Sequence, residues 1–378
     1  MFKTALIGFD YRPVESRYAG HGIAVFWRNI LSCISRRPIS SSIRLLGCTY
    51  RGQSPVPGFS YRAVVRPFFK RWAWEHILWP LDVIRNNIVV LHSSVSLGPI
   101  HDFALPLFCP CRRIATIFDL NAYHMPANEH IHATLPFRMQ QRALSSVDAI
   151  TTISGFVQKD ISRRFGIAEH SIIVLPCAVD EEIRLIYDRG TYEAKESGRY
   201  IFSMGETANK NIAVVIRTFE GLCAGGYAGN LCIAGRETEQ TGEVLALFRA
   251  SRFRDRIRFL GRLATAELVG YYAKCDFFFY PSLCEGFGLP VLEAQYCNAP
   301  VLCSNATALP EAGGQAAVYR AAADVRGFIE DGNRLLHDSN LRTRCIRNGR
   351  VRAAAKTWDS AADTLIELYK RLYGVSTT

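Results

Sequence analysis

Short hydrophobic runs alternate with longer amphipathic stretches along most of the chain. The runs are rich in β-branched and aromatic residues and are hydrophobic at consecutive positions, which is typical of parallel strands covered on both faces. In the first half we expect strands at 2–9, 42–48, 88–92, 113–118, 149–153 and 171–175. In the second half we expect strands at 200–204, 230–234, 257–260, 277–280, 300–303 and 316–319.

This rhythm repeats, so the pattern predicts an α/β protein with two similar units in tandem. A length of 378 residues agrees with two cores rather than one. The polar stretch 176–198 carries charges of both signs and marks the boundary, which gives predicted domains at 1–192 and 193–357. Residues 358–378 have hydrophobic positions close to a 3.6-residue period, and we expect them to form a helix that packs back on the first domain.

The composition adds a net charge of +11, which favours an anionic partner. The basic residues are scattered in pairs, so nucleic acid is not expected. No hydrophobic run approaches the roughly 20 residues that span a bilayer, and we expect a cytoplasmic protein for which peripheral contact with the inner membrane face stays open. The aromatic and basic stretch 68–79 is either a membrane-surface helix or a core helix, because Ile77, Leu81 and Val83 lead into a buried strand.

Two other kinds of site are not expected from the sequence. The twelve cysteines lie in apolar stretches and are interpreted as reduced core residues. The closest pair, Cys109 and Cys111, has no partner ligands nearby, so we expect no metal site. After the first strand the sequence reads Gly8-Phe-Asp-Tyr-Arg-Pro13, which lacks the G-x-G-x-x-G turn of a Rossmann dehydrogenase.

The strongest chemical signal is the segment from Glu285 to Glu293, Glu-Gly-Phe-Gly-Leu-Pro-Val-Leu-Glu. It follows the strand expected at 277–280, and open α/β sheets bind ligands at the carboxyl ends of their strands. Gly286 and Gly288 permit close backbone approach, and the segment then enters a helix whose first amides can receive a phosphate. One carboxylate can reach a sugar while the other accepts from ribose hydroxyls. The alternative is a helix start capped by a glutamate.

This segment resembles glycosyltransferase family 4, whose E-x7-E signature matches the spacing of the two glutamates. The resemblance is close over 199–320, including Phe259-Leu-Gly261 and Leu309-Pro-Glu-Ala-Gly313, and looser in the first half. It implies the GT-B fold, in which two Rossmann-like domains face each other across a cleft, with the acceptor on the first and the nucleotide-sugar on the second. It also implies a retaining, metal-independent hexosyltransferase of polysaccharide or lipopolysaccharide assembly.

The resemblance assigns roles residue by residue. Glu285 would contact the sugar and Glu293 the ribose, while Lys210 would offset the charge of the leaving diphosphate. A solvated lysine at a helix start is the alternative for Lys210. The candidate catalytic residues are Glu285 and Asp119. The candidate donor-binding residues are Lys210, Gly286, Phe287, Gly288, Leu289, Glu293, Gly22 and Arg236.

The ligands follow from the same resemblance. No cofactor is expected beyond the nucleotide-sugar itself, with GDP-mannose as the first expectation and a UDP-sugar as the second. The acceptor would be a glycan, free or linked to a polyprenyl diphosphate. The positive charge of the chain fits such an acceptor at an anionic membrane surface.

Two positions depart from the family pattern. Glu206 stands where an arginine commonly follows the glycine, and a carboxylate beside phosphate is repulsive, so either it points away or Arg12, Arg17 or Arg236 compensates. Phe118 stands where relatives carry a histidine near the reacting sugar, and His21 and His124 are the nearest histidines, each interpreted as structural or solvent-facing. These departures keep a second hypothesis open, an inactive homologue that binds nucleotide or glycan and supports a partner enzyme.

Overall fold

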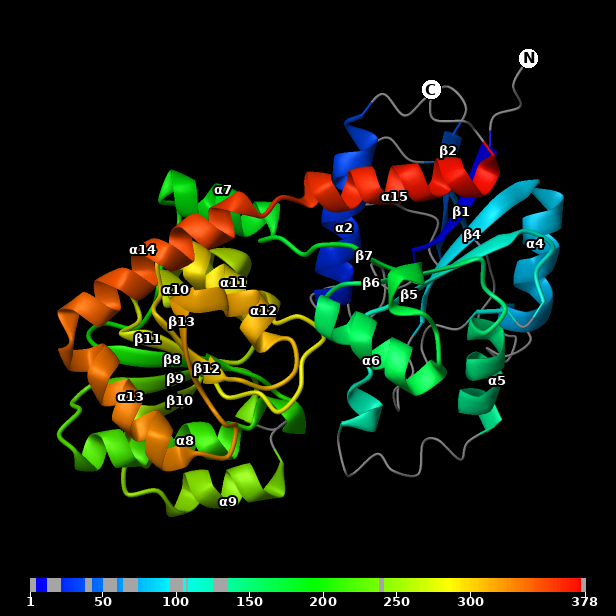
Figure 1. Cartoon of the computed structure of the whole chain (residues 1–378). Helices are drawn as coiled ribbons and strands as arrows, with labels where there is room; N and C mark the ends of the chain where they lie inside the picture. Colours follow the sequence, from blue (N-terminus) through cyan, green and yellow to red (C-terminus); the bar gives the residue numbers. More distant parts are fainter. Residues whose placement is uncertain are drawn as a thin grey trace. The chain divides into compact units, whose positions relative to one another are not determined.

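The computed structural model describes residues 5–11, 22–37, 43–49, 60–63, 74–95, 105–106, 108–124, 135–237 and 241–374. The chain divides into two compact units, one formed by Met1–Cys177 with Thr357–Thr378 and the other by Ala178–Lys356. Each unit is built on an open sheet of parallel strands with helices on its faces (Figure 1).

The sheet of the first unit has the strand order β3-β2-β1-β4-β5-β6-β7, and all its pairs are parallel. The strands are β1 (Ala5–Asp10), β2 (Ile43–Thr49), β3 (Ser60–Ala63), β4 (Ile88–Val95), β5 (Arg112–Ile117), β6 (Ala149–Thr152) and β7 (Ile172–Val174). The six predicted strands are confirmed, with their ends shifted by a few residues. The strand β3 was not predicted, because Ser-Tyr-Arg-Ala contains no hydrophobic run; among the described strands it pairs with β2 at the sheet edge.

Helices cover both faces of this sheet. The helices are α2 (Gly22–Ser35), α4 (Trp79–Arg85), α5 (Leu135–Leu144), α6 (Gly155–Phe165) and α15 (Trp358–Tyr373). On one face, α2 and α15 enclose an aromatic core in which the ring of Phe26 lies edge-on to Trp358, with centroids 5.5 Å apart. The Tyr369 hydroxyl of α15 lies 2.8 Å from Nδ1 of His92 in β4, which ties the closing helix to the sheet. On the other face, α4, α5 and α6 pack on β4, β5 and β6.

The sheet of the second unit has the strand order β10-β9-β8-β11-β12-β13, again with parallel pairs. The strands are β8 (Tyr200–Met204), β9 (Asn230–Ala234), β10 (Ile257–Phe259), β11 (Phe277–Tyr280), β12 (Val301–Ser304) and β13 (Ala317–Arg320). The helices are α7 (Glu181–Arg189), α8 (Ile212–Ala224), α9 (Gly242–Ala250), α10 (Thr265–Lys274), α11 (Leu289–Tyr296), α12 (Leu309–Gly313), α13 (Val325–His337) and α14 (Ser339–Ala355). All six predicted strands are confirmed within one residue at each end.

The division between the units differs from the predicted boundary at 192. The first unit ends at Cys177, because α7 belongs to the second unit. Asp188 of α7 accepts a hydrogen bond from the Tyr296 hydroxyl at 2.7 Å and pairs with Arg350 of α14 at 2.8 Å. Part of the polar stretch that suggested a linker is the exposed side of this amphipathic helix. Residues 358–373 form the expected closing helix, which groups with the first unit.

The stretch 68–79 is described from Trp74 onward, where a π-helical turn leads into α4. Trp79 and Val83 are buried, as the core interpretation expects, but Ile77 and Leu81 are 48% and 40% exposed. The expectation that these two residues belong to the core is therefore wrong, because they lie on the outer side of the helix. In the described parts of the chain, no helix is long and apolar enough to cross a membrane.

Candidate sugar-donor site

The loop after β11 carries the predicted site and turns sharply into α11. Gly288 stands just before the helix with φ of 104°, a conformation that L-residues other than glycine rarely adopt. A Cβ at this position would also lie 2.7 Å from Cδ2 of Leu309. Pro290 occupies the first turn of α11, where its missing N–H leaves no bond unmade. Glycine is therefore required by both the turn and the packing of α12 against it.

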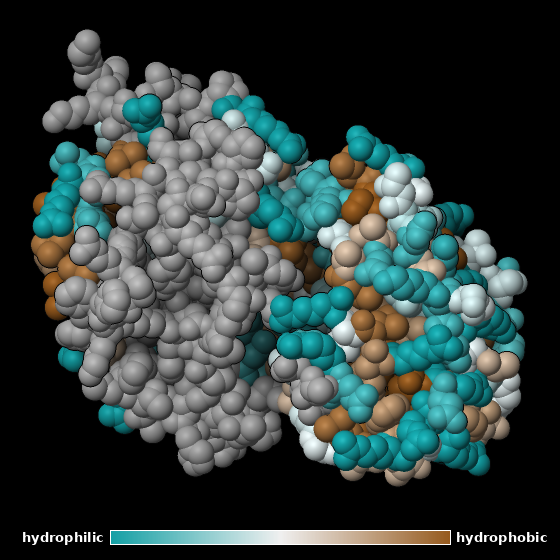
Figure 2. All heavy atoms as spheres, turned by 180° about the vertical axis from the view of Figure 1, so that it is seen from behind, coloured by the Kyte–Doolittle hydropathy of each residue, from teal (hydrophilic) through white to brown (hydrophobic). Residues whose placement is uncertain are grey.

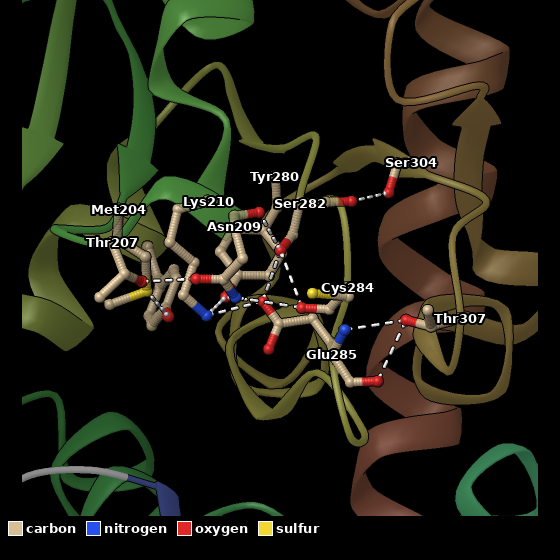
Figure 3. A network of polar contacts seen from close by, with 11 residues as sticks. Met204, Thr207, Asn209, Lys210, Tyr280, Ser282, Cys284, Glu285, Ser304 and Thr307 are labelled. Carbon is tan, nitrogen blue, oxygen red and sulfur yellow. Dashed lines mark hydrogen bonds and ion pairs between the residues drawn. The ribbon is translucent and has the colours of Figure 1, made fainter. Parts of the chain in front are cut away.

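Glu285 is held in this loop through one of its two carboxylate oxygens (Figure 3). Its Oε1 accepts hydrogen bonds from Lys210 Nζ at 2.6 Å, the Tyr280 hydroxyl at 2.7 Å and the Ser282 hydroxyl at 2.7 Å. No described residue bonds to Oε2, which points away from this network in Figure 3. The Thr307 hydroxyl fixes the backbone, accepting from the Glu285 N–H at 2.8 Å and donating to its carbonyl at 3.0 Å. The carboxylate is thus oriented with one oxygen left for a ligand hydroxyl.

Lys210 reaches this carboxylate from a short turn between β8 and α8. Its Nζ also donates to the Tyr280 hydroxyl at 2.6 Å, and its side chain is 21% exposed. The turn itself is tied to the β11 loop, because the Asn209 carbonyl accepts from the Leu283 N–H at 2.7 Å. Lys210 is therefore a paired and largely covered lysine, and the solvated alternative is wrong.

Glu293 is the fifth residue of α11 and is buried. Burial, and after it the negative charge of Asp180, raises the pKa of Glu293 to about 8, although the Tyr272 hydroxyl donates to its Oε2 at 3.4 Å. A carboxyl with this pKa is mostly protonated at neutral pH. Glu293 can accordingly donate as well as accept hydrogen bonds.

The remaining predicted donor-binding residues of this unit lie at the same edge of the sheet. Phe287 is buried beside Gly286, and Lys356 Nζ lies 5.9 Å from the centre of its ring. Leu289 is the first residue of α11. Arg236 follows β9, and its backbone N–H and Nε donate to Oε1 of Glu206 at 2.9 and 3.3 Å. Glu206 is therefore paired with a cation, while Arg12 and Arg17 lie outside the described residues.

The first-unit candidates are described separately. Gly22 begins α2, and Asp119 follows β5, where its Oδ1 accepts from the Asn121 N–H at 3.0 Å. Phe118 is buried, with its ring edge-on to Phe26 at a centroid distance of 5.2 Å, so it serves the aromatic core. 

The histidines and cysteines of the first unit have other environments. His124 Nε2 lies 2.7 Å from Asp160 Oδ2, which agrees with the structural interpretation, and His21 lies outside the described residues. The Sγ atoms of Cys109 and Cys111 are 3.3 Å apart. Among the residues that the structure describes, no three histidine, cysteine or acidic side chains are grouped as a metal site would need.

The structure adds residues that the sequence did not assign to the site. Tyr280 ends β11 and Ser282 follows it, both just before the predicted segment, and Thr307 has no sequence signal of its own. Their role depends on which strand ends are neighbours, because Thr307 follows β12 and Lys210 follows β8, on either side of β11. Spacing along the chain does not reveal such a relation.

The region that carries this site is similar to known proteins. Residues 188–352 match the family model of the glycosyl transferases group 1. The chain is 26% identical over 272 residues to O-antigen chain mannosyltransferase B of Escherichia coli, covering 69% of this chain and 71% of that protein. It is 29% identical over 238 residues to the serotype-specific mannosyltransferase WbdA of Escherichia coli, covering 60% of this chain but 29% of WbdA.

Solved structures share the whole fold at low identity. Sucrose-phosphate synthase of Thermosynechococcus elongatus superposes with a TM-score of 0.71 at 15% identity, covering 99% of this chain and 100% of that one. WaaG, a glycosyltransferase involved in lipopolysaccharide biosynthesis, superposes with a TM-score of 0.70 at 14% identity, covering 96% of this chain and 99% of that one. These structures show that the chain has the GT-B fold, and the region that carries the donor site, somewhat under half of the chain, matches the family model of the group 1 glycosyltransferases.

Proposed function

We propose that this protein is a retaining glycosyltransferase that moves a hexose from a nucleotide diphosphate sugar to a growing glycan. Mannose is the first candidate for the hexose. The observation that carries the proposal is the hold on Glu285. Three hydrogen-bond donors fix Oε1 and leave Oε2 outside the network. One of the three donors, Lys210, is 75 positions away from Glu285 in the sequence. A carboxylate fixed in this way can accept from a sugar hydroxyl without first reorganising, which is the arrangement that favours transition-state stabilisation.

The sugar donor in this proposal is GDP-mannose, with a UDP-sugar as the runner-up. Lys210 supplies a positive charge where the diphosphate would leave, and it can exchange part of its pairing with Glu285 for phosphate oxygens. Glu293, mostly protonated before binding, would meet the ribose hydroxyls. Mannose is preferred because two of the similar bacterial proteins are named mannosyltransferases. The chemistry needs no metal, because the lysine and backbone amides can take over charge compensation.

The acceptor in this proposal is a glycan built on a lipid carrier at the inner face of a membrane, as in lipopolysaccharide assembly. The outer side of α4 and of the π-helical turn before it supports such a location, because Ile77, Leu81 and Ile84 are exposed there beside Arg85. Phe108 is 74% exposed and precedes Cys109, which lines the same pocket as Ile84. Figure 2 shows hydrophobic and hydrophilic side chains next to one another at the edge of the unit that α4 occupies. Apolar and basic groups in this arrangement fit an anionic lipid surface.

The activity is tested by release of nucleoside diphosphate from GDP-mannose and UDP-sugars with a glycan acceptor. Glu285→Gln should lower turnover about a hundredfold, because it removes the charge on which Lys210, Tyr280 and Ser282 converge. Glu330→Gln is the matched control, since this glutamate is 53% exposed on α13 and should leave turnover unchanged. Turnover that survives in Glu285→Gln would contradict the site assignment. Nucleotide binding without turnover for any donor and acceptor, with a copurifying enzyme, would instead support the noncatalytic partner hypothesis.

The membrane location is tested by flotation with vesicles of phosphatidylglycerol and phosphatidylethanolamine. We expect salt-sensitive binding that the double variant Leu81→Glu with Ile84→Glu abolishes, because acidic groups at this surface oppose both apolar insertion and anionic headgroups. Val351→Glu is the control, since Val351 is 67% exposed on α14 of the second unit. Flotation that is unchanged in the double variant would argue against α4 as the lipid-binding surface.

A further inference from the structure

Three neighbouring strands of the second unit end in the same way, with a glycine followed by a charged residue. β8, β9 and β10 lie side by side in the sheet, so their carboxyl ends form adjacent corners. The corners of β9 and β10 are joined by two backbone hydrogen bonds between Gly235 and Gly261, of 2.9 and 3.1 Å. The three pairs are Gly205-Glu206, Gly235-Arg236 and Gly261-Arg262.

The first corner is in contact with the proposed sugar-donor site. Gly205 has φ of 147°, and a Cβ added to it would lie 2.3 Å from both Cβ and Cγ of Lys210. Gly235 has φ of 145°, and its Cβ would lie 2.7 Å from the Gly205 carbonyl oxygen. Both corners therefore need glycine, and Gly205, the residue before Glu206, packs directly against the lysine that pairs with Glu285.

Glu206 holds Arg236 through two hydrogen bonds to one oxygen. The backbone N–H of Arg236 donates to Oε1 at 2.9 Å and Nε of the same residue donates at 3.3 Å. Partial burial alone would raise the pKa of Glu206, but these bonds and the charges of Arg236 and Arg262 outweigh it and lower the pKa. The carboxylate is therefore ionised at neutral pH and faces two arginines.

We propose that Glu206 is a positioning residue that anchors Arg236, and that the Arg236 guanidinium binds the diphosphate of the sugar donor. In this arrangement Arg236 supplies from the end of β9 the positive charge that relatives supply with an arginine directly after the glycine of β8. The side chain of Arg236 is 44% exposed and that of Glu206 is 22% exposed, so the cation is the more accessible member of the pair. A guanidinium is planar and carries several N–H donors, and that geometry suits a phosphate. The inference rests on the proposed function, because it assumes that a nucleoside diphosphate binds beside Lys210.

The competing interpretation makes the opposite prediction for one substitution. If Glu206 acted only through its negative charge, removing it would tighten binding of a diphosphate. If Glu206 positions Arg236, removing it weakens binding, because the guanidinium is no longer held in place and must be ordered by the ligand. The sign of the change in affinity for Glu206→Ala therefore separates the two.

The test is calorimetric titration of GDP and of UDP into the full-length protein. We expect Arg236→Ala to raise the dissociation constant about tenfold, the typical effect of one hydrogen bond to a charged group. Glu206→Ala should raise it severalfold, and in the Arg236→Ala background the same substitution should have no further weakening effect. Glu206→Arg combined with Arg236→Ala should recover part of the lost affinity, because it places the cation on β8 instead of β9.

Each outcome bears on a distinct statement. Tighter binding in Glu206→Ala, or an unchanged dissociation constant in Arg236→Ala, would overturn the positioning role while leaving the proposed function intact. A wild-type protein that binds neither GDP nor UDP would overturn both. Arg326→Ala, at an exposed arginine of α13, is the matched control and should bind as the wild type does. Thermal unfolding of every variant separates lost binding from lost folding, and a variant that unfolds early is replaced by Glu206→Gln, which keeps an acceptor oxygen for Arg236.

Discussion

The buried carboxyl of Glu293 makes the stability of the second unit depend on pH near neutrality. Burial, followed by the charge of Asp180, raises its pKa from an ordinary 4.5 to about 8. In the unfolded chain the same group ionises near its ordinary value. The informative substitution is Glu293→Gln, which keeps the shape of the side chain and the acceptor for the Tyr272 hydroxyl but removes the titration.

The sign and size of the effect follow from these two pKa values. Between pH 4.5 and 8 the folded state binds a proton that the unfolded state has released, so the free energy of unfolding decreases as pH rises through this window. Each unit of pKa difference corresponds to about 1.4 kcal/mol, and most of the window lies between pH 5 and pH 8. Over that range the free energy of unfolding of the wild type should therefore fall by about 3 kcal/mol relative to that of Glu293→Gln. The stability contribution is fully present below the unfolded-state pKa and is lost as the carboxyl ionises.

The assay is urea unfolding of both proteins from pH 5 to pH 8. It should be followed by far-ultraviolet circular dichroism, because all five tryptophans fall within the residue ranges of the first unit and their fluorescence would not report the second. Titrations common to both proteins cancel in the difference between them. We expect Glu293→Gln to become progressively more stable than the wild type as pH rises. Unfolding midpoints that move in parallel across this range would refute the raised pKa of Glu293.

Two further substitutions test the loop that holds the carboxylate. Tyr280→Phe removes the buried hydroxyl that bridges Lys210 and Glu285, and turnover should fall about tenfold with donor affinity less affected, as a split of kcat from KM would show. Equal losses of affinity and turnover would contradict this positioning role. Gly288→Ala adds a Cβ 2.7 Å from Leu309 at φ of 104°, and thermal or urea unfolding should show a loss of about 2 kcal/mol or more. Gly242→Ala is its control, because an added Cβ there meets nothing within 4 Å.

The strand pattern of the second unit could be predicted from sequence because its strands are buried on both faces. Phe277 to Tyr280 are all buried, and such a run of consecutive hydrophobic positions between polar segments has few other interpretations. The edge strand β3 shows the converse, since a short strand paired on one side needs no hydrophobic run. The helix α7 was missed as a structural element because its exposed face is charged and its buried face is short. Periodicity over nine residues is a weak signal against so polar a composition.

The donor site was predictable where its residues lie together in the chain. Glu285, Gly288 and Glu293 belong to one segment, and the loop-to-helix geometry follows from the glycines and the helix start that the sequence shows. The contacts that give the site its electrostatic character join segments far apart in sequence. Lys210 meets Glu285 across 75 positions, and Arg236 meets Glu206 across 30, because the strands before them are neighbours in the sheet. Only the strand order turns these separations into contacts.

The two departures from the family pattern have different physical consequences. At Glu206 the reversed charge is compensated within the same unit, since Arg236, at the end of the neighbouring strand, pairs with it. At Phe118 a ring packs against Phe26 and contributes to the aromatic core, so the side chain at this position stabilises the first unit and offers no hydrogen bond. Under the proposed function, nucleotide binding by the second unit should therefore be preserved, and Asp119, next in sequence to Phe118, is the first-unit candidate for a polar role in turnover. Asp119→Asn should accordingly lower turnover while leaving the dissociation constants of GDP and UDP unchanged. A loss of nucleotide affinity in this variant would contradict the prediction that Asp119 acts in turnover and not in nucleotide binding.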